Sequence, residues 1–548
     1  MKKHLFFFLL LLFSVVAQAQ RLKKFSENPE EFSGQLQNWM GEFKEDGAEP
    51  LYLSFQPVFS ADWDSDQQQA FIASCNNLLR KRVTDYTSWF SLLKVSLALY
   101  EQEMPATALA WVTHFEELSR KSPQRESAQY LQLCMLNFTD SLISDMRNVQ
   151  WQAFNGSRTF EMNPEPQFVY TDIDLWGFFR GDSTVIEMTN GIFDPVKQQM
   201  SLEGGTVYFE RAGFGRDTVY AELSRLKLNV DQGSFEADSV TLHSLIYLPG
   251  PTLGHLEERL SSDSREGKST FPRFESYRHD IRIQDIVKDV DYEGGFSMIG
   301  SQLFGSGSQQ EPSKLYFKYE GNPFVRAASD RFRFRSNIIR TEGARVAIYL
   351  QDDSIYHPKL DLRLIIPLQT VSLIRQNEGS AQTAIRNSFH NMEMYLEVIR
   401  WKLGEPQLRL GNLNLGGNSA VIFESDQYYR GERFSAIQGM SNTNPLYYLK
   451  QLSSSLDRRE VSRSEVQHAL RMSETATERF LLNMMVAGFV DYDTYTKTAR
   501  IKEKTFEYIN NADNKRDYDV IRFQSRIAQG DNARLSLLNY DLEINGID

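Results

Sequence analysis

Two aspartates and two aromatic residues follow one another at alternate positions in the segment YTDIDLWGFF. They are Asp172, Asp174, Trp176 and Phe178. Alternate residues of a β-strand lie on the same face of a sheet, so all four would share one face. Paired carboxylates beside aromatic rings are typical of sites that bind or cleave sugars. Asp172 and Asp174 are therefore the catalytic candidates of a glycan-active enzyme, with Trp176 and Phe178 as substrate-binding candidates. The simpler alternative is a strand end with solvated acids.

Other catalytic patterns are missing from the sequence. There is no G-x-S-x-G and no H-E-x-x-H, and the segment EGKST lacks the first glycine of a phosphate-binding loop. The eight histidines are scattered, and none is paired at the spacing of metal ligands. We therefore expect no metal and no cofactor, and we favour a protein without catalysis.

The chain has only two cysteines, Cys75 and Cys134, and both fall in the helical N-terminal part. An oxidising compartment would permit a disulfide between them. Two buried thiols that behave as small hydrophobic groups are the alternative. Two cysteines without a histidine cluster do not complete a four-ligand zinc site.

The segment 462–502 has the pattern of a winged helix, with two short helices followed by two strands. Ser462 and Glu465 predict a capping box at the first helix. The segment holds six basic and five acidic residues, which is a weak electrostatic match for DNA. We expect it to dock on protein instead, through a second helix whose apolar residues divide between its own core and a contact with the β-rich body. The docking candidates on that helix are Phe480, Leu481, Met484 and Val486.

These residues must be positioned by several domains, and the pattern predicts a multidomain α+β protein. Apolar residues at helical spacing predict an N-terminal helical domain over 20–150. Short alternating strands then predict an all-β body over 151–440, with a flexible insertion at about 255–312. Thr-Val and Ser-[Leu/Phe]-Glu motifs recur 34 and 33 residues apart within it. This repeat favours a β-solenoid-like array, with an ordinary sandwich as the alternative.

The C-terminal part is predicted as a winged-helix-like module over 446–512, followed by the start of a further β segment over 513–548. The apolar alternation from Leu535 to Ile544 stops within four residues of the end. An exposed apolar edge strand invites pairing with another chain, so we expect a partner strand there or a longer native chain.

The first residues have the pattern of an export signal. Lys2 and Lys3 precede an apolar run of a dozen residues, and Ala17-Gln18-Ala19 supplies the small residues of a cleavage site. We expect cleavage after Ala19 and no later transmembrane span. The net charge of −12 disfavours nucleic acid as a partner.

Three segments carry a resemblance to a known group of proteins. DYEGGFSMIGSQLFGSG, DSIYHPKLDLRL and NSFHNMEMYLEVIRWKLGEP resemble parts of large exported cell-envelope proteins of Bacteroidota, over roughly residues 150–548. The resemblance brings no activity and no catalytic residues. Together with the export signal, it leaves a periplasmic, an outer-membrane-associated or an extracellular location open.

The interpretation that combines these features is an exported, non-catalytic cell-envelope protein. Its body would act as a scaffold or as a binding surface for a protein or glycan partner. The rival hypothesis is a glycan-active β-solenoid lyase or hydrolase that uses Asp172 and Asp174.

Overall fold

The computed structural model describes residues 22–102, 104–245, 248, 250–260, 270–308, 310–413, 420–438, 443–494, 496–515 and 521–547. The predicted signal peptide at 1–19 lies outside the described residues. The chain forms two compact units, the first comprising residues 1–243 and 255–272 and the second 244–254 and 273–548.

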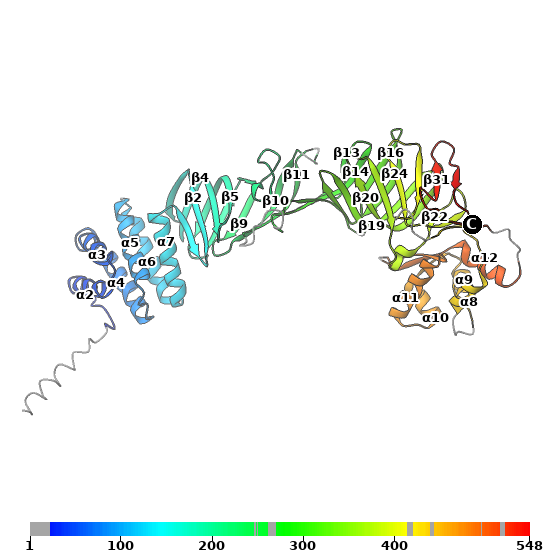
Figure 1. Cartoon of the computed structure of the whole chain (residues 1–548). Coiled ribbons are helices and arrows are strands. Elements are labelled where there is room, and N and C mark those ends of the chain that lie inside the picture. The colour runs from blue at the N-terminus through cyan, green and yellow to red at the C-terminus, as the bar shows by residue number, and fades with distance from the viewer. Residues whose placement is uncertain are drawn as a thin grey trace, which may run out of the picture. The chain divides into compact units, whose positions relative to one another are not determined.

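The first unit begins with a helical bundle (Figure 1). Its helices are α2 (Pro29–Glu42), α3 (Ala48–Pro57) with the π-helical turn Val58–Asp62, α4 (Ser65–Arg80), α5 (Tyr86–Glu101), α6 (Pro105–Lys121) and α7 (Gln124–Thr139). Asp64 caps α4 in a capping box with Gln67, as expected where an acidic side chain accepts from the free N–H groups of a first turn. Helix α7 ends at Thr139 and the first strand starts at Leu142, so the helical domain is shorter than the predicted 20–150.

The two cysteines follow the second of the two alternatives, buried thiols without a disulfide. Cys75 on α4 and Cys134 on α7 are both free and completely buried. Burial raises the pKa of the Cys134 thiol to about 12, which keeps it protonated and unreactive.

The rest of the first unit is an antiparallel sheet. Its strands are β1 (Leu142–Met146), β2 (Val149–Phe154), β3 (Ser157–Met162), β4 (Pro166–Phe179), β5 (Asp182–Asp194), β6 (Gln199–Glu203), β7 (Thr206–Tyr208), β8 (Val219–Glu222), β9 (Arg225–Asn229) and β10 (Ser234–Ser244), with β11 (Thr252–Arg259) at the division between the units. The long strands β4 and β5 pair with different short strands along their two halves. They bend where Asp172 and Met188 adopt a left-handed backbone and the register shifts. Such a bulge redirects a strand, so one sheet becomes two half-sheets that enclose a core.

The second unit repeats this plan. Its strands are β12 (Arg273–Ser276), β13 (Ile281–Val287), β14 (Val290–Ile299), β15 (Gln302–Ser306), β16 (Ser313–Tyr319), β17 (Asn322–Ser329), β18 (Arg331–Arg335), β19 (Ile338–Leu350), β20 (Asp353–Ile365), β21 (Thr370–Arg375), β22 (Ile385–Asn387), β23 (Met392–Tyr395), β24 (Val398–Lys402), β25 (Gln407–Gly411), β26 (Val421–Ser425), β30 (Arg522–Ser525), β31 (Ala533–Ser536) and β32 (Leu542–Ile544). Strands β14, β19 and β20 each belong to both half-sheets. Inward-facing aromatic and aliphatic residues, including Tyr292, Phe296 and Phe317, fill the space between them.

Two boundaries predicted within the β-rich body are wrong. The region 255–312 is not an insertion, because strands β11 to β15 occupy most of its described residues and pair with the rest of the sheet. The region 513–548 does not begin a further β segment. Strand β30 pairs with β26 and β31 with β25, so the last strands complete the existing sheet by satisfying the backbone groups at its edge.

The C-terminal residues are paired within the chain. Strand β32 pairs with β31, and Ile547 forms a bridge with Ser525. Leu542–Ile544 therefore have one partner strand in the same hairpin, and pairing of their other side with another chain stays a prediction.

The repeated motifs lie in one antiparallel sheet. Leu202 on β6 and Phe235 on β10 are both buried, and β9 lies between their strands. Val185 on β5 and Val219 on β8 are likewise separated by β7, but Val219 is buried whereas Val185 is half-exposed on the outer face. The pairings that link these repeated motifs are antiparallel.

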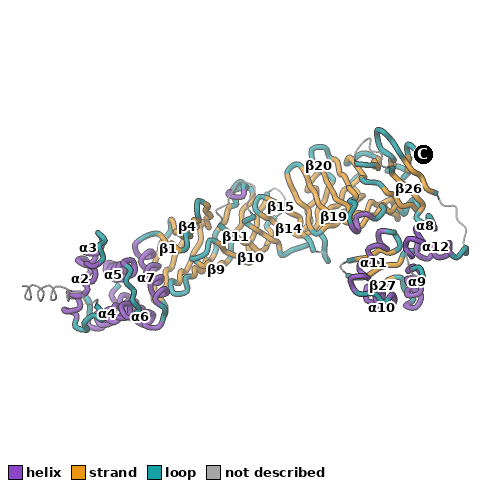
Figure 2. The backbone as a smooth tube through the Cα atoms, turned by 60° about the horizontal axis from the view of Figure 1, so that its bottom comes forward, coloured by secondary structure: helices purple, strands orange, loops and turns teal. Residues whose placement is uncertain are grey.

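A small helical module is inserted between β26 and β30 (Figure 2). It contains α8 (Gly431–Gln438), α9 (Pro445–Leu456), β27 (Glu460–Ser462), α10 (Arg463–Leu470), α11 (Glu474–Val486), β28 (Val490–Asp493), β29 (Thr498–Ile501) and α12 (Glu503–Ala512). We call residues 431–512 the C-terminal module. Its three strands form a separate antiparallel sheet in the order β27-β29-β28. Ser462 caps α10 and Glu465 completes the predicted capping box.

Candidate functional site: a basic groove beside the C-terminal module

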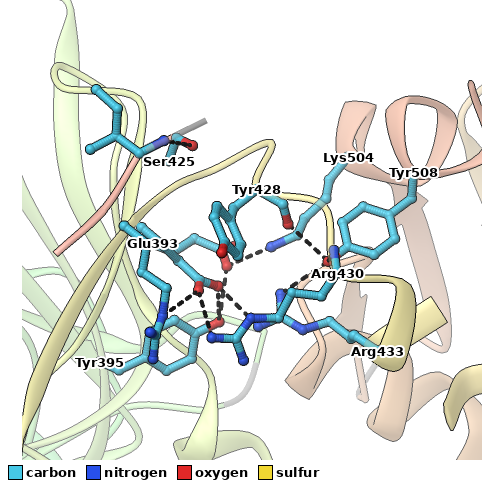
Figure 3. A network of polar contacts seen from close by, with 11 residues as sticks. Glu393, Tyr395, Ser425, Tyr428, Arg430, Arg433, Lys504 and Tyr508 are labelled. Carbon is cyan, nitrogen blue, oxygen red and sulfur yellow. Dashed lines mark hydrogen bonds and ion pairs between the residues drawn. The ribbon is translucent and has the colours of Figure 1, made fainter. Parts of the chain in front are cut away.

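The C-terminal module is fastened to the sheet by buried charges (Figure 3). Lys504 of α12 lies 2.6 Å from a carboxylate oxygen of Glu393 on β23, and both side chains are only 4% exposed. Burial lowers the pKa of Lys504, whereas Glu393 acts to raise it. These two residues are far apart in the sequence, so this ion pair holds the module against the sheet.

A second buried carboxylate extends this network. Glu424 on β26 is 1% exposed and lies 2.9 Å from a guanidinium nitrogen of Arg433 on α8. The hydroxyl of Tyr395 donates to Glu393 at 3.1 Å and lies 3.3 Å from Glu424. Tyr508 of α12 donates to a backbone carbonyl of the same region, that of Tyr428, at 2.8 Å. The network is a structural fastening, because its acids and bases are already engaged with one another.

Beside this fastening lies a groove of about 690 Å³ between the sheet and the C-terminal module. Strands β18, β19, β20 and β22 supply one wall, and the end of α11 with β28 supplies the other. Basic side chains outnumber acidic ones along it. The basic residues are Arg331, Arg333, Arg340, Arg345, Lys359, Arg386 and Lys502, and the acidic ones are Asp330, Glu342, Glu393, Asp491 and Asp493.

None of the groove's five arginines has an ion-pair partner among the described residues. Among the described residues, no carboxylate lies within 4.0 Å of Arg331, Arg333, Arg340, Arg345 or Arg386. By contrast, two of the groove's carboxylates have basic partners. Glu393 forms an ion pair with Lys504, and Asp491 lies 3.8 Å from Lys502. The groove therefore presents guanidinium groups whose donors are open to a ligand.

One wall of the groove is organised around an aromatic ring. The guanidinium groups of Arg331 and Arg333 lie 5.1 and 5.5 Å from the centre of the Phe304 ring. Stacking on a ring fixes the plane of a guanidinium and leaves its edge free to donate in parallel to a carboxylate or phosphate. Burial and the nearby Arg340 and Arg335 lower the pKa of Arg333, a sign that positive charges are crowded there.

The predicted glycan residues lie in the first unit and have structural roles. The Asp174 carboxylate accepts from Asn155 at 2.6 Å and from the backbone N–H of Met188 at 3.0 Å, and so it stabilises the bulge in β5. Asp172 is itself the bulge residue of β4. Both acids are at least partly exposed, with the buried Ile173 between them. Trp176 and Phe178 do share a half-buried face, with rings stacked at 5.8 Å.

Three of the four predicted docking residues belong to the core of the C-terminal module, and the fourth lines the groove. Leu481 and Met484 are buried in the core of the C-terminal module, and Phe480 packs at its edge. Val486 lines the groove together with its neighbour Met485. The groove arginines were not among the predicted site residues, although the alternation RFRFR on β18 was a visible signal of one basic face.

The described residues offer no group of three His, Cys, Asp or Glu side chains that could hold a metal ion. Within the same residues, none of the helices has the length and apolar character needed to cross a membrane. No family model, curated protein or solved structure matches this chain.

Proposed function

We propose that this protein is a non-catalytic, exported cell-envelope protein that binds an acidic glycan in the groove between its sheet and its C-terminal module. The observation that carries the proposal is the set of unpaired arginines facing one cavity. Arg331 and Arg333 are oriented by Phe304, and Arg345 and Arg386 face the same space.

The chemistry of these side chains selects the ligand class. A guanidinium group binds a carboxylate through two parallel hydrogen bonds, and such charge-assisted bonds are the strong ones. Arg333 and Arg340 are direct cross-strand partners, an arrangement that is destabilising for like charges. A bound anion would relieve this repulsion, which supports a role for the groove in binding.

Several features favour binding over the rival glycan-active enzyme. The carboxylate of Asp174 is occupied by two donors that hold the fold. Neither Asp172 nor Asp174 lines the groove. Within the groove, Glu393 is neutralised by a buried lysine, which leaves it poorly suited to act as a general acid or base.

The location and finer fold belong to the same proposal. The N-terminal sequence pattern supports export with cleavage after Ala19, and the antiparallel array supports a solenoid-like scaffold with repeated strand pairs. The order of helices and strands in the C-terminal module supports a winged helix that serves as a protein-docking element rather than a DNA reader. Its buried ion pair with the sheet supports this role.

The proposal is tested by calorimetric titration of the full mature chain with a short oligogalacturonate of three sugars. We expect saturable binding that weakens at least about tenfold in Arg345→Gln or Arg386→Gln, because each loses a charge-assisted hydrogen bond worth about 1.5–3 kcal/mol. The matched control is Arg282→Gln on β13, whose side chain is 80% exposed and lies outside the groove.

A neutral trisaccharide of the same size should not bind. Absence of binding by the acidic trisaccharide, or equal losses in Arg282→Gln and the groove variants, would contradict the proposal.

A further inference from the structure

We propose that the groove is one end of a longer track, on which a linear acidic polysaccharide lies across the strands of the second unit. The track is a row of arginines on the outer face of one half-sheet. This inference rests on the proposed function, because it names the form of the ligand that the groove would take.

The row follows from the register of the strands. Arg333 on β18 is the cross-strand partner of Arg340 on β19, which is in turn the partner of Arg363 on β20. The row then crosses Ser372 on β21. It continues through Arg400, Arg409 and Arg534 on β24, β25 and β31.

These side chains all lie on one face. Each arginine of the row is exposed or half-buried, and the residues immediately before and after it are buried in the core. We call Arg333, Arg340, Arg363, Arg400, Arg409 and Arg534 the arginine ladder. Arg333 and Arg340 also line the groove, so the ladder leads from the groove onto the open face. Strands β20, β24 and β31 mark its course in Figure 1.

The chain itself supplies few carboxylates to neutralise the charges of the arginine ladder. Among the described residues, no carboxylate lies within 4.0 Å of Arg363, as is also true of Arg333 and Arg340. Arg400 donates to backbone carbonyls of Asn412 and Leu413. Among the described residues, ion pairs within 4.0 Å occur at the far end of the ladder, where Glu405 lies 3.5 Å from Arg409 and Asp531 lies 3.5 Å from Arg534.

Like charges directly opposite each other in a sheet are destabilising, so a run of them needs a reason outside the fold. This cost stands out in a chain whose net charge is −12. An anionic ligand laid along the row would convert the repulsion into a series of attractive contacts.

The spacing of the ladder fits a linear polymer. Neighbouring strands are about 4.8 Å apart, so the six steps from Arg333 to Arg534 span roughly 29 Å. A polyuronate carries one carboxylate on every sugar ring and therefore offers a charge at each step of its length. Many weak contacts along such a chain act together, because binding of one sugar raises the effective concentration of the next.

The neighbouring row on the same face argues against single-stranded nucleic acid. It contains Ile338, Ile365, Thr370 and Lys402, which are cross-strand neighbours in that order. Proteins that hold single strands alternate basic groups with exposed aromatic rings on which bases stack. Phe304, the ring beside Arg331 and Arg333, is only 3% exposed, so a base could not stack on it.

The test measures how the affinity of the full chain depends on oligogalacturonate length, from three sugars to ten. We expect the affinity to rise at least tenfold over this range for the unmodified chain. The double variant Arg363→Gln, Arg409→Gln should lose this gain and keep the affinity for the trimer, since neither residue lines the groove. Arg282→Gln should behave as the unmodified chain.

The outcomes separate the two proposals. If the trimer binds in the groove and longer chains bind no more tightly, the ladder inference is overturned while the proposed function stands. If the trimer fails to bind but long chains bind through Arg363 and Arg409, the ladder stands and the groove does not. Oligothymidylate or vesicles of anionic lipid that bind through the ladder as tightly as the decamer would overturn the choice of polysaccharide.

Discussion

At the scale of single residues, the Lys504–Glu393 pair is the contact on which the C-terminal module most depends. Both side chains are 4% exposed and 2.6 Å apart, so each neutralises a charge that water does not reach. Breaking a buried pair by removing one partner typically costs 3–5 kcal/mol, because the other charge is left uncompensated. We therefore expect Lys504→Ala to lower the free energy of unfolding by about 3–5 kcal/mol, measured by urea denaturation.

Two control variants distinguish loss of the buried ion pair from the general effect of removing a lysine. Lys24→Ala breaks the pair between Lys24 and Glu27, whose side chains are 65% and 73% exposed, and should leave the free energy of unfolding almost unchanged. The double variant Glu393→Gln, Lys504→Met removes both charges and should recover much of the loss. A Lys504→Ala effect no larger than that of Lys24→Ala would contradict the fastening role.

At the scale of elements, Gly488 ends helix α11 where the module meets the sheet. Its φ of +83° is a left-handed conformation that strains residues with a Cβ, and a Cβ there would lie 2.8 Å from a carboxylate oxygen of Glu393. We expect the backbone strain in Gly488→Ala to lower the free energy of unfolding by about 1–2 kcal/mol. The total loss should be larger, because Glu393 must also shift away from Lys504. Gly404→Ala, at φ +83° with open space around it, carries the strain without the clash and is the matched control. Equal losses in the two variants would show that the approach to Glu393 is unimportant.

The elements also show which features the sequence could predict. Local signals sufficed for the helices and for the capping box of Ser462 and Glu465, because these depend on residues a few positions apart. The bends in β4 and β5 were hidden, since a bulge at Asp172 or Met188 has no strong residue preference. The alternation of YTDIDLWGFF therefore gave no sign of the bulge at Asp172.

The functional groups were harder to predict than the fold. The arginine ladder depends on the register of distant strands, because shifting one strand by one residue would turn its arginine inward. Arg363 and Arg400, for example, fall into one row only through Ser372 between them. The fastening was equally hidden, since Glu393 and Lys504 meet only after the module has folded and returned to the sheet.

At the scale of the whole molecule, the two units contain buried titratable groups of opposite effect. In the first unit, Arg211 lies between the buried carboxylates of Asp182 and Glu258, and burial raises the pKa of Glu258 to about 7. In the second unit, His357 is 1% exposed and bonded to Thr383 and to the backbone N–H of Lys359. Burial lowers the pKa of His357 to about 4.

These shifts give pH dependences of opposite sign. Glu258 has a folded pKa above its unfolded value of 4.5, so its contribution to stability is complete at low pH and is lost as pH rises through about 7. His357 has a folded pKa below its unfolded value of 6.5, so its contribution is present at high pH and is lost as pH falls from about 6.5 toward 4. Between pH 8 and pH 6 each group changes the stability of its unit by on the order of 1 kcal/mol, in opposite directions.

We therefore expect scanning calorimetry of the full chain at pH 8 and pH 6 to resolve two transitions that respond differently. Acidification should raise the transition temperature of the first unit more in the unmodified chain than in Glu258→Gln, which lacks the titrating carboxyl group. His114 lies in the same unit, and burial lowers its pKa. Because both proteins contain His114, its effect cancels in the comparison. Acidification should lower the transition temperature of the second unit. This fall should be smaller in His357→Gln, because glutamine keeps hydrogen-bonding capacity but does not titrate. Identical shifts of both transitions, unaffected by either substitution, would show that neither buried group is linked to the unfolding of its unit.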